Sequence, residues 1–287
     1  MIALRFAKLE GLGNDFVVLE ETLLDKKVFS QLAKQICNRR LGIGADGLIL
    51  YRSLSPPQTH FEMRLFNADG SEAEISGNGL RCLAAHLFHQ RPDAWTELLI
   101  QTRAGLKRIR KIRAGMSLYY FEVEMGVPLL DPAAIPFCPL PVPESLVGYE
   151  LRVGNALYLV TVTSMGNPHC SIFVGSFESL DWKEIGSQIE THSLFPQRTN
   201  VEFVRVIGPA EIEVRFWERG VGSTWSSGTG ACAAVVASVL NGYTERHVQV
   251  RTEGGELEIE WRADNSLMMA GPARLICEGE CYIDDAY

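Results

Sequence analysis

Two short boxes of serine and glycine stand directly before apolar runs in this chain. The first is Ser-Gly-Asn-Gly at residues 76–79, followed by LRCLAAHLF, and the second is Ser-Gly-Thr-Gly at 227–230, followed by ACAAVVASVL. Glycine lets the backbone come close to a ligand, and the first turn of a helix has unpaired N–H groups with a partial positive charge. Carboxylates and phosphates bind at such turns. The boxes therefore predict an anion site built from two helix N-termini.

A purely structural interpretation stands beside this chemistry, because serine is a preferred N-cap and either box alone is more often a simple helix start. Other site chemistries find less support. The chain has no G-x-x-x-x-G-K-[ST] phosphate loop, and neither Ser76 nor Ser227 lies in a G-x-S-x-G hydrolase motif. His169 has the position of a loop base, but we expect it to be a structural hydrogen-bonding residue. The pairing of the boxes favours a ligand site.

Composition limits the class of protein. A chain of 287 residues with 46% hydrophobic content is long enough for two domains, each with its own core. The net charge of −8 gives no footprint for nucleic acid, and the basic run at residues 107–113 is expected to form a solvated hairpin or loop face. We see no signal peptide and no apolar run of membrane length, and we expect a cytoplasmic protein without membrane contact. The seven cysteines lack a metal-binding spacing, so we expect reduced thiols and no metal.

Strands dominate the elements that must position the boxes. Alternating or β-branched patterns predict them at residues 2–8, 16–20, 61–66, 98–102, 118–125, 156–163, 171–174, 201–206, 210–217, 247–252, 256–261 and 266–270. Helices are predicted at 29–40, 79–89, 182–190 and 230–240. The two that follow the boxes are apolar nearly all round, which is typical of buried helices. Repeated prolines between residues 128 and 143 predict a linker in the middle of the chain.

An internal repeat relates the two boxes. Setting Ser76 on Ser227 also brings RLFN (64–67) onto RFWE (215–218), and a similar offset lays GNDF (13–16) on GNPH (166–169). The spacing is too long for a solenoid, so we infer a duplicated domain. We expect an α+β protein of two pseudo-symmetric domains, residues 1–127 with 275–287 and residues 128–274. Each would be a mostly antiparallel sheet around a central buried helix, with the ligand in the cleft between them.

A series of motifs resembles the diaminopimelate epimerase family, the cofactor-independent two-base racemases that include proline racemase. The matching stretches are GLGNDF (11–16), GIGADG (42–47), FNADGSE (66–72), GNG (77–79), GNPH (166–169), RTN (198–200), ERGVG (218–222) and GTG (228–230). The resemblance covers almost the whole chain, and its motifs occur in order.

The resemblance implies epimerisation of LL-diaminopimelate to the meso form, in lysine and peptidoglycan precursor synthesis, without a cofactor or metal. It also implies a cytoplasmic protein, an amino-acid substrate as partner, and a homodimer. The implied substrate-binding residues are Asn14, Asn67, Gly77, Asn78, Asn167, Asn200, Glu218, Arg219, Gly228 and Thr229. Arg219 suits a distal carboxylate and Glu218 an ammonium group. Alternatively, Asn14 and Asn167 are turn residues and Glu218 and Arg219 a surface pair.

The chain departs from the family where the resemblance places its two acid/base cysteines, because Ser76 and Ser227 occupy these positions. A thiol can be tuned toward neutral pH, whereas a serine hydroxyl is a far weaker acid and needs an adjacent base. Cys82 and Cys232, a few residues further on, are expected to be core residues.

Ser223 and Trp225 also depart from the pattern, since the family usually has glutamate and a smaller apolar residue there. Three interpretations stay open. The chain is an epimerase in which the serines have further help; or it is a relative with another role, such as a dehydratase, another racemase or a binding protein without turnover; or its serines are replacements that silence an enzyme.

Overall fold

The computed structural model describes residues 2–21, 28–54 and 60–283, and it divides into two compact units. Unit 1 consists of Met1–Val123 and Ala270–Tyr287, and unit 2 of Glu124–Met269. The sequence placed the boundaries at 127/128 and 274/275. The observed ones fall inside continuous strands, β8 (Leu118–Gly126) and β17 (Leu267–Ile283). Residues 284–287 of the expected first domain lie outside the described residues.

Unit 1 is a sheet of long strands with two helices. Its other strands are β1 (Ile2–Gly11), β2 (Asn14–Glu20), β3 (Gly47–Ser53), β4 (His60–Asn67), β5 (Glu72–Ala73), β6 (Glu97–Thr102) and β7 (Gly105–Ala114). Most neighbours are antiparallel, but β2 is parallel to β3 and β4 to β6. β17 pairs with both β1 and β8. Helix α1 (Phe29–Ile36) joins β2 to β3, and α2 (Gly77–Gln90) joins β5 to β6.

Unit 2 repeats this plan. Its strands are β9 (Tyr149–Val153), β10 (Ala156–Ser164), β11 (Pro168–Phe173), β12 (Asn200–Gly208), β13 (Glu211–Glu218), β14 (Gly222–Thr224), β15 (His247–Thr252) and β16 (Gly255–Trp261). The parallel pairs recur as β11 with β12 and β13 with β15, and the helices recur as α3 (Trp182–Glu190) and α4 (Gly228–Leu240). The same order of pairings in both units confirms the duplicated α+β domain.

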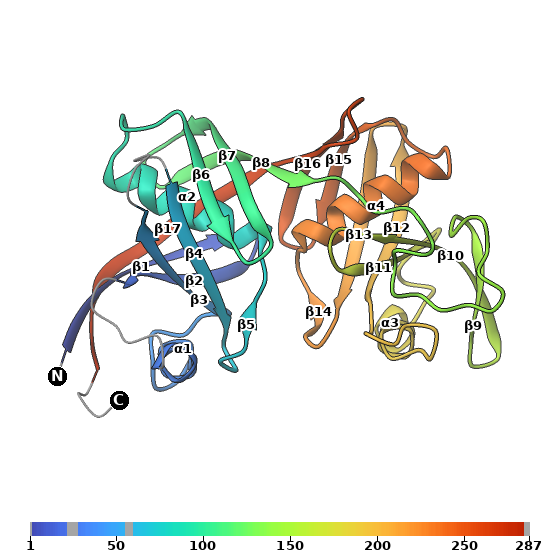
Figure 1. The fold of residues 1–287 in the computed structure, drawn as a ribbon, viewed down its shortest axis with the longest axis horizontal. Coiled ribbons are helices and arrows are strands. Elements are labelled where there is room, and N and C mark those ends of the chain that lie inside the picture. The colour runs from blue at the N-terminus through green and yellow to red at the C-terminus, as the bar shows by residue number, and fades with distance from the viewer. Residues whose placement is uncertain (1, 22–27, 55–59, 284–287) are drawn as a thin grey trace. The chain divides into compact units, whose positions relative to one another are not determined.

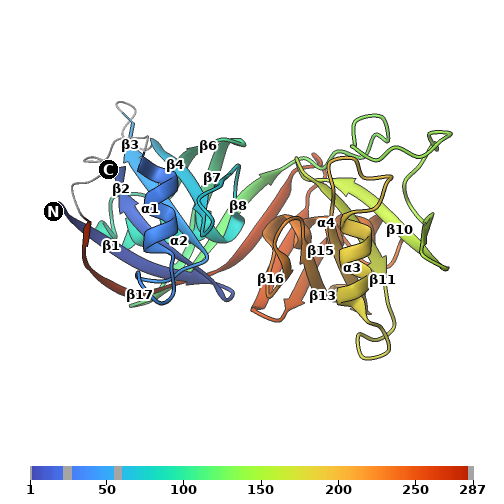
Figure 2. The ribbon, with the colours of Figure 1, turned by 90° about the horizontal axis from the view of Figure 1, so that it is seen from below.

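The helix after each box is the buried centre of its unit (Figure 1). In α2 every residue from Gly77 to Phe88 is buried, and the helix packs against β1, β2 and β7. Helix α4 packs against β10, β11, β12, β13, β15 and β16. The outer helix α1 packs on β3 and β4, and α3 on β9, β12, β13 and β14 (Figure 2). Both central helices begin directly after their serine, two residues earlier than expected.

Several elements differ from the sequence prediction. Strand β3 was missed because its buried run GLIL lacks the alternation that marks a half-buried strand. Helix α1 ends at Ile36 rather than residue 40, because the Asn38 side chain accepts hydrogen bonds from the backbone N–H groups of Arg40 and Leu41. The predicted final strand continues far past residue 270, since the last part of β17 pairs with β1.

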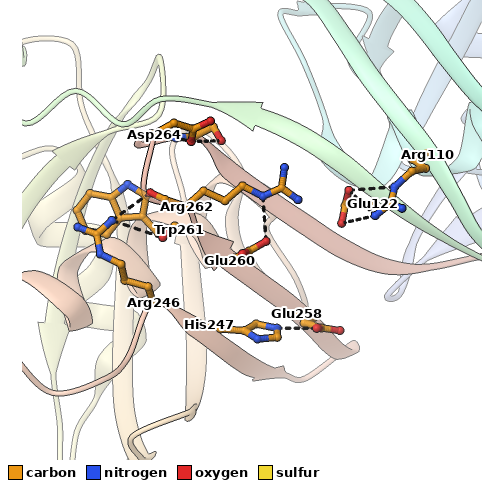
Figure 3. A network of polar contacts seen from close by, with 10 residues as sticks. Arg110, Glu122, Arg246, His247, Glu258, Glu260, Trp261, Arg262 and Asp264 are labelled. Carbon is orange, nitrogen blue, oxygen red and sulfur yellow. Dashed lines mark hydrogen bonds and ion pairs between the residues drawn. The ribbon is translucent and has the colours of Figure 1, made fainter.

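The proline-rich segment is not a free linker, because Ile135 and Phe137 are buried in the core of unit 2. The basic run at residues 107–113 lies in β7, the middle strand of an antiparallel meander. Its charged side chains are largely exposed, and some of them form ion pairs with the neighbouring strands. Figure 3 shows one of them, Arg110 with Glu122, and in unit 2 the pair of His247 and Glu258. No helix among the described residues is long and apolar enough to cross a membrane.

Candidate active site

Ser76, in the first box, is the N-cap of α2. Its backbone is extended (φ −138°, ψ 124°), and its hydroxyl oxygen accepts a hydrogen bond of 3.1 Å from the Gly79 N–H. The side chain is half-buried. Among the residues that the structure describes, no carboxylate or imidazole of unit 1 is hydrogen-bonded to this hydroxyl. Among these described residues, the hydroxyl proton of Ser76 therefore has no carboxylate or imidazole as acceptor.

Two of the expected substrate-binding residues meet beside this box. Asn78 is buried, and its Nδ2 lies 3.5 Å from Oδ1 of Asn14, at the start of β2. Arg81 donates to Asn78 Oδ1 over 2.6 Å, and Asn14 donates to Asp46 Oδ2 over 2.8 Å. The two amides are thus held from both sides by other side chains of unit 1. Asn67 ends β4 as an exposed side chain that donates to Ser71.

The sequence did not indicate that Arg81 and Asp46 contact the asparagines beside the first box. Arg81 is completely buried in α2, and its Nε also donates to the carbonyl oxygen of Pro272 in β17 over 3.0 Å. Asp46 accepts from Arg39 as well as from Asn14. A signal for Asp46 was its place in GIGADG, but the contacts depend on how strands pack, which sequence spacing does not encode.

Ser227, in the second box, is the N-cap of α4 in nearly the same conformation (φ −132°, ψ 124°), and it accepts from the Gly230 N–H over 3.3 Å. Unlike Ser76, it also donates its hydroxyl proton to Oε2 of Glu218 over 2.9 Å. The other oxygen of Glu218 accepts a hydrogen bond of 2.6 Å from Thr224. Removal from water raises the pKa of Glu218 above its usual value, although these two hydroxyls lower it in part. The second serine therefore has an adjacent base.

His169 lies in the core of unit 2 between two polar groups. Its Nδ1 is 2.6 Å from Oε1 of Glu202, and its Nε2 is 3.0 Å from Oδ1 of Asn167. Burial raises the pKa of Glu202, and the neighbouring imidazole opposes that rise. The expectation of a structural hydrogen-bonding histidine agrees with these contacts. They also fix the amide of Asn167 as an acceptor toward His169.

Asn200 and Arg219 are brought together at the end of β13. Asn200 is buried, its Nδ2 donates to the carbonyl oxygen of Pro168, and its Oδ1 accepts from the backbone N–H of Arg219, both over 3.0 Å. The Arg219 side chain is exposed and donates to the carbonyl oxygen of Gln197. Its guanidinium is therefore open to an acidic ligand, whereas the amide of Asn200 braces the turn beneath it.

The remaining candidates lie around the helix starts. Gly77 and Gly228 are the buried first residues of α2 and α4, and Thr229 is half-buried. Cys82 and Cys232 are completely buried, which confirms them as core residues, and burial raises the pKa of the Cys82 thiol far above its usual value.

The two further departures from the family lie on the surface of unit 2. Ser223 is exposed in β14, and the side chain of Trp225 is 61% exposed. Between Trp225 and Ser227, the Ser226 hydroxyl is buried. Among the described residues, no group of three histidine, cysteine or acidic side chains is arranged to hold a metal ion.

Comparison with known proteins gives consistent results. The chain matches the family model described as Diaminopimelate epimerase over residues 6–130 and 161–276. The Diaminopimelate epimerase of Pelotomaculum thermopropionicum is 43% identical over 279 residues, which are 96% of this chain and 98% of that protein. That of Carboxydothermus hydrogenoformans is 43% identical over 283 residues, covering 98% of this chain and 100% of that protein.

Solved structures share the fold at much lower identity. A predicted epimerase from Pseudomonas aeruginosa has a TM-score of 0.71 at 17% identity, over 98% of this chain and 100% of that chain. A hydroxyproline epimerase from Agrobacterium vitis, solved with bound trans-4-hydroxy-L-proline, has a TM-score of 0.70 at 11% identity, over 99% of this chain and 94% of that chain. At such identities the likeness concerns the fold alone.

Proposed function

The chain belongs to the diaminopimelate epimerase family, and from that premise we propose that it interconverts LL- and meso-diaminopimelate without a cofactor, with Ser76 and Ser227 exchanging the α-proton. Both boxes would act on the same substrate molecule. The α-carboxylate would lie at the helix N-termini, whose partial positive charge stabilises the negative charge that develops when the α-proton leaves.

The observation that carries this proposal is the hydrogen bond from Ser227 to Glu218. A serine hydroxyl needs an adjacent base to remove a proton. As the Ser227 oxygen takes the α-proton, its own proton passes to Glu218, so one C–H bond breaks and one carboxyl O–H bond forms. A raised pKa makes Glu218 a better base near neutral pH. The sequence assigned Glu218 to a substrate ammonium group, but its contacts favour this role on Ser227.

Ser76 would act on the opposite face of the α-carbon by donating its hydroxyl proton to the carbanion, and solvent would then restore that proton. In the reverse direction Ser227 would donate its hydroxyl proton to the carbanion and recover one from Glu218, while the Ser76 oxygen would take the α-proton and release its own hydroxyl proton to solvent. Arg219 would hold the distal carboxylate, because its exposed guanidinium can pair with a carboxylate bidentately. Asn14, Asn67, Asn78, Asn167 and Asn200, with the first helical residues Gly77, Gly228 and Thr229, would line the same site.

Incubation with LL-diaminopimelate in D2O tests the proposal. We expect deuterium at the α-carbon together with meso product, both followed by mass spectrometry and chiral chromatography. Binding without deuterium exchange would identify a ligand-binding protein instead. Exchange of another amino acid, with none of diaminopimelate, would identify a different racemase or dehydratase of the same fold.

Family membership also motivates a proposal about cell location and assembly. We propose that the protein works in the cytoplasm, where precursors of lysine and the cell wall are made, and that it forms a homodimer. Sedimentation equilibrium of the purified chain measures the dimer directly, and a monomer at micromolar concentration would contradict it.

A further inference from the structure

The turn that follows β13 carries both Glu218 and Arg219, and a carboxylate from a different element holds this turn. That carboxylate belongs to Glu190, the last residue of α3. Its Oε2 accepts a hydrogen bond of 2.8 Å from the indole N–H of Trp217, and its Oε1 accepts one of 2.9 Å from the backbone N–H of Gly220. Glu190 thus grips the chain on both sides of Glu218 and Arg219.

Glu190 stays charged in this position although its side chain is buried. Burial alone would raise its pKa, but the hydrogen bonds from Trp217 and Gly220 and the guanidinium of Arg198 outweigh burial and hold the pKa below its usual value. Arg198 Nη1 lies 3.3 Å from Oε1. A charged acceptor forms stronger hydrogen bonds than a neutral one, so the carboxylate is a firm anchor for two N–H groups.

The surrounding packing leaves little freedom to either partner of this contact. A Cβ atom on Gly186 of α3 would lie 2.8 Å from the Cβ of Trp217, so the helix backbone is pressed against the base of that side chain. Helix and strand are therefore in direct contact at the point where Glu190 reaches across. If the turn after β13 moved, Glu190 could keep its two hydrogen bonds only if α3 moved as well, and that would disturb the contact between Gly186 and Trp217.

The other N–H groups of the turn also have acceptors. Arg219 N–H donates to Asn200, and Val221 N–H donates to the carbonyl oxygen of Glu218 over 3.0 Å. Gly220 has a φ of +76°, the left-handed value that the third position of a type II turn needs. Within the part of the chain that the structure describes, Glu190 and Asn200 are the side chains that accept from the backbone N–H groups of this turn, and Glu190 is the charged one.

We propose that Glu190 is a positioning residue, which touches no substrate but sets the direction of the Glu218 carboxylate toward Ser227 and that of Arg219 toward the ligand. This inference rests on the proposed function. A displacement of about 1 Å at a reacting group can lower a rate by about a hundredfold. A displacement of this size would break or greatly weaken the hydrogen bond of 2.9 Å between Ser227 and Glu218.

Glu190→Gln tests the proposal, because it keeps the shape of the side chain but replaces one acceptor oxygen by a donor. Glu184→Gln, on the exposed first turn of the same helix, is the matched control. We expect kcat for α-deuteration to fall roughly tenfold to a hundredfold in Glu190→Gln, measured per folded protein. The pH at which activity falls off on the acid side should also move, since the environment of Glu218 changes. Glu184→Gln should match the wild type.

A lower melting temperature with unchanged kcat, KM and pH profile would overturn the proposal, because a merely structural residue has that signature. Trp217→Phe removes the indole donor and part of the ring but leaves the contact of Glu190 with the Gly220 N–H, so it should shift kcat per folded protein in the same direction by a smaller factor. A Trp217→Phe protein with a larger loss than Glu190→Gln would also contradict the assignment to Glu190.

Amide hydrogen exchange at Gly220 separates this inference from the proposed function. We expect exchange at Gly220 to be faster in Glu190→Gln than in the wild type, and unchanged in Glu184→Gln. Unchanged protection at Gly220 would overturn the positioning role even in a protein that shows turnover. If the wild type exchanges no α-proton of diaminopimelate, the proposed function fails, and faster Gly220 exchange still supports the grip of Glu190 on the turn.

Discussion

The two serine boxes have the same backbone and different chemical surroundings. Ser76 and Ser227 share an extended conformation, and each accepts from the N–H of the second glycine of its box. The last long strand before each box ends differently, however, because β4 finishes with Asn67 and β13 with Glu218. The amide donates to a loop serine, whereas the carboxylate accepts from Ser227. Duplication kept the cap and let the side chain at the strand end become specific to each copy.

The central helices differ in the same way. Helix α2 carries buried Arg81 and His86, while the buried positions of α4 hold only small or apolar residues, mostly alanine and valine. A polar side chain inside a core needs partners, so hydrogen bonds of Arg81 and His86 tie the middle of α2 to its unit, whereas the side-chain hydrogen bonds from α4 to other elements include those at its two caps, Ser227 with Glu218 and Asn241 with Thr161. The central helix of unit 1 therefore carries buried charged or titratable side chains, whereas the serine with an adjacent base lies at the start of the central helix of unit 2.

The largest expected effect comes from removing that base. Glu218→Gln should lower the rate of α-deuteration by roughly a hundredfold to ten-thousandfold, the usual contribution of general acid–base catalysis. Glu213→Gln, on the same strand but in a surface ion pair, is the control and should leave the rate unchanged. Equal rates for Glu218→Gln and the wild type would remove the chemical difference between the boxes.

The second effect is a loss of folding stability at acid pH, and it arises from His86 in unit 1. Burial, and to a smaller degree the charge of His89, lowers the pKa of His86 to about 4. Between pH 6.5 and 4 the unfolded chain binds a proton that the folded protein does not, so stability falls as the pH falls, by about 3 kcal/mol in all. Urea unfolding from pH 7 to 4 measures the slope.

His86→Met should remove most of this slope, and His247→Gln, on the surface of unit 2, should keep it. Hydrogen exchange should show the loss of protection in α2 before α4. A slope that survives His86→Met would place the acid sensitivity elsewhere and undo the contrast between the central helices.

Single cysteine substitutions should separate the two serines. A thiol at a helix N-terminus supplies its own acid and base at neutral pH. Ser76→Cys should therefore raise the exchange rate by roughly a hundredfold, and Ser227→Cys by roughly tenfold, because Ser227 already has Glu218 as a base. The double variant should exceed both. A larger gain at Ser227 than at Ser76 would reverse the assignment of the assisted serine.

The smallest effect is the loss of each cap. Ser76→Ala should cost about 1 kcal/mol of unfolding free energy, the usual value for an N-cap. Ser227→Ala should cost about 1 kcal/mol more, because it also removes the hydrogen bond that the Ser227 hydroxyl donates to the Glu218 carboxylate. Urea titrations at neutral pH measure both, and equal losses would mean that the Glu218 contact contributes nothing to stability.

Much of the fold followed from local patterns. The strand alternation, the apolar helices after each box and the repeated order of motifs all depend on neighbouring residues, so they could be recognised without coordinates. Strand β3 could not, because a short apolar run fits a buried strand and a buried helix equally well. The proline-rich segment was misjudged for a related reason, since composition does not reveal that Phe137 fills a hydrophobic core.

The candidate site was predicted only in part. The sequence supplied the boxes and the loop residues, because a cap and a turn are local structures. It did not indicate Arg81, Asp46 or Glu190, whose partners lie on other elements. Nor did it indicate that His169 is shared between Glu202 and Asn167, since those contacts arise from the pairing of β11 with β12.

By itself, the sequence determined that the chain is a duplicated domain with two helix starts capped by serine, because these features are written in residues close together along the chain. Only the tertiary structure decided which serine meets a carboxylate. The end of β13 brings Glu218 within 2.9 Å of Ser227, while the end of β4 turns Asn67 toward Ser71. A hydrogen bond between elements depends on packing geometry to within an ångström, and spacing in the sequence does not specify it.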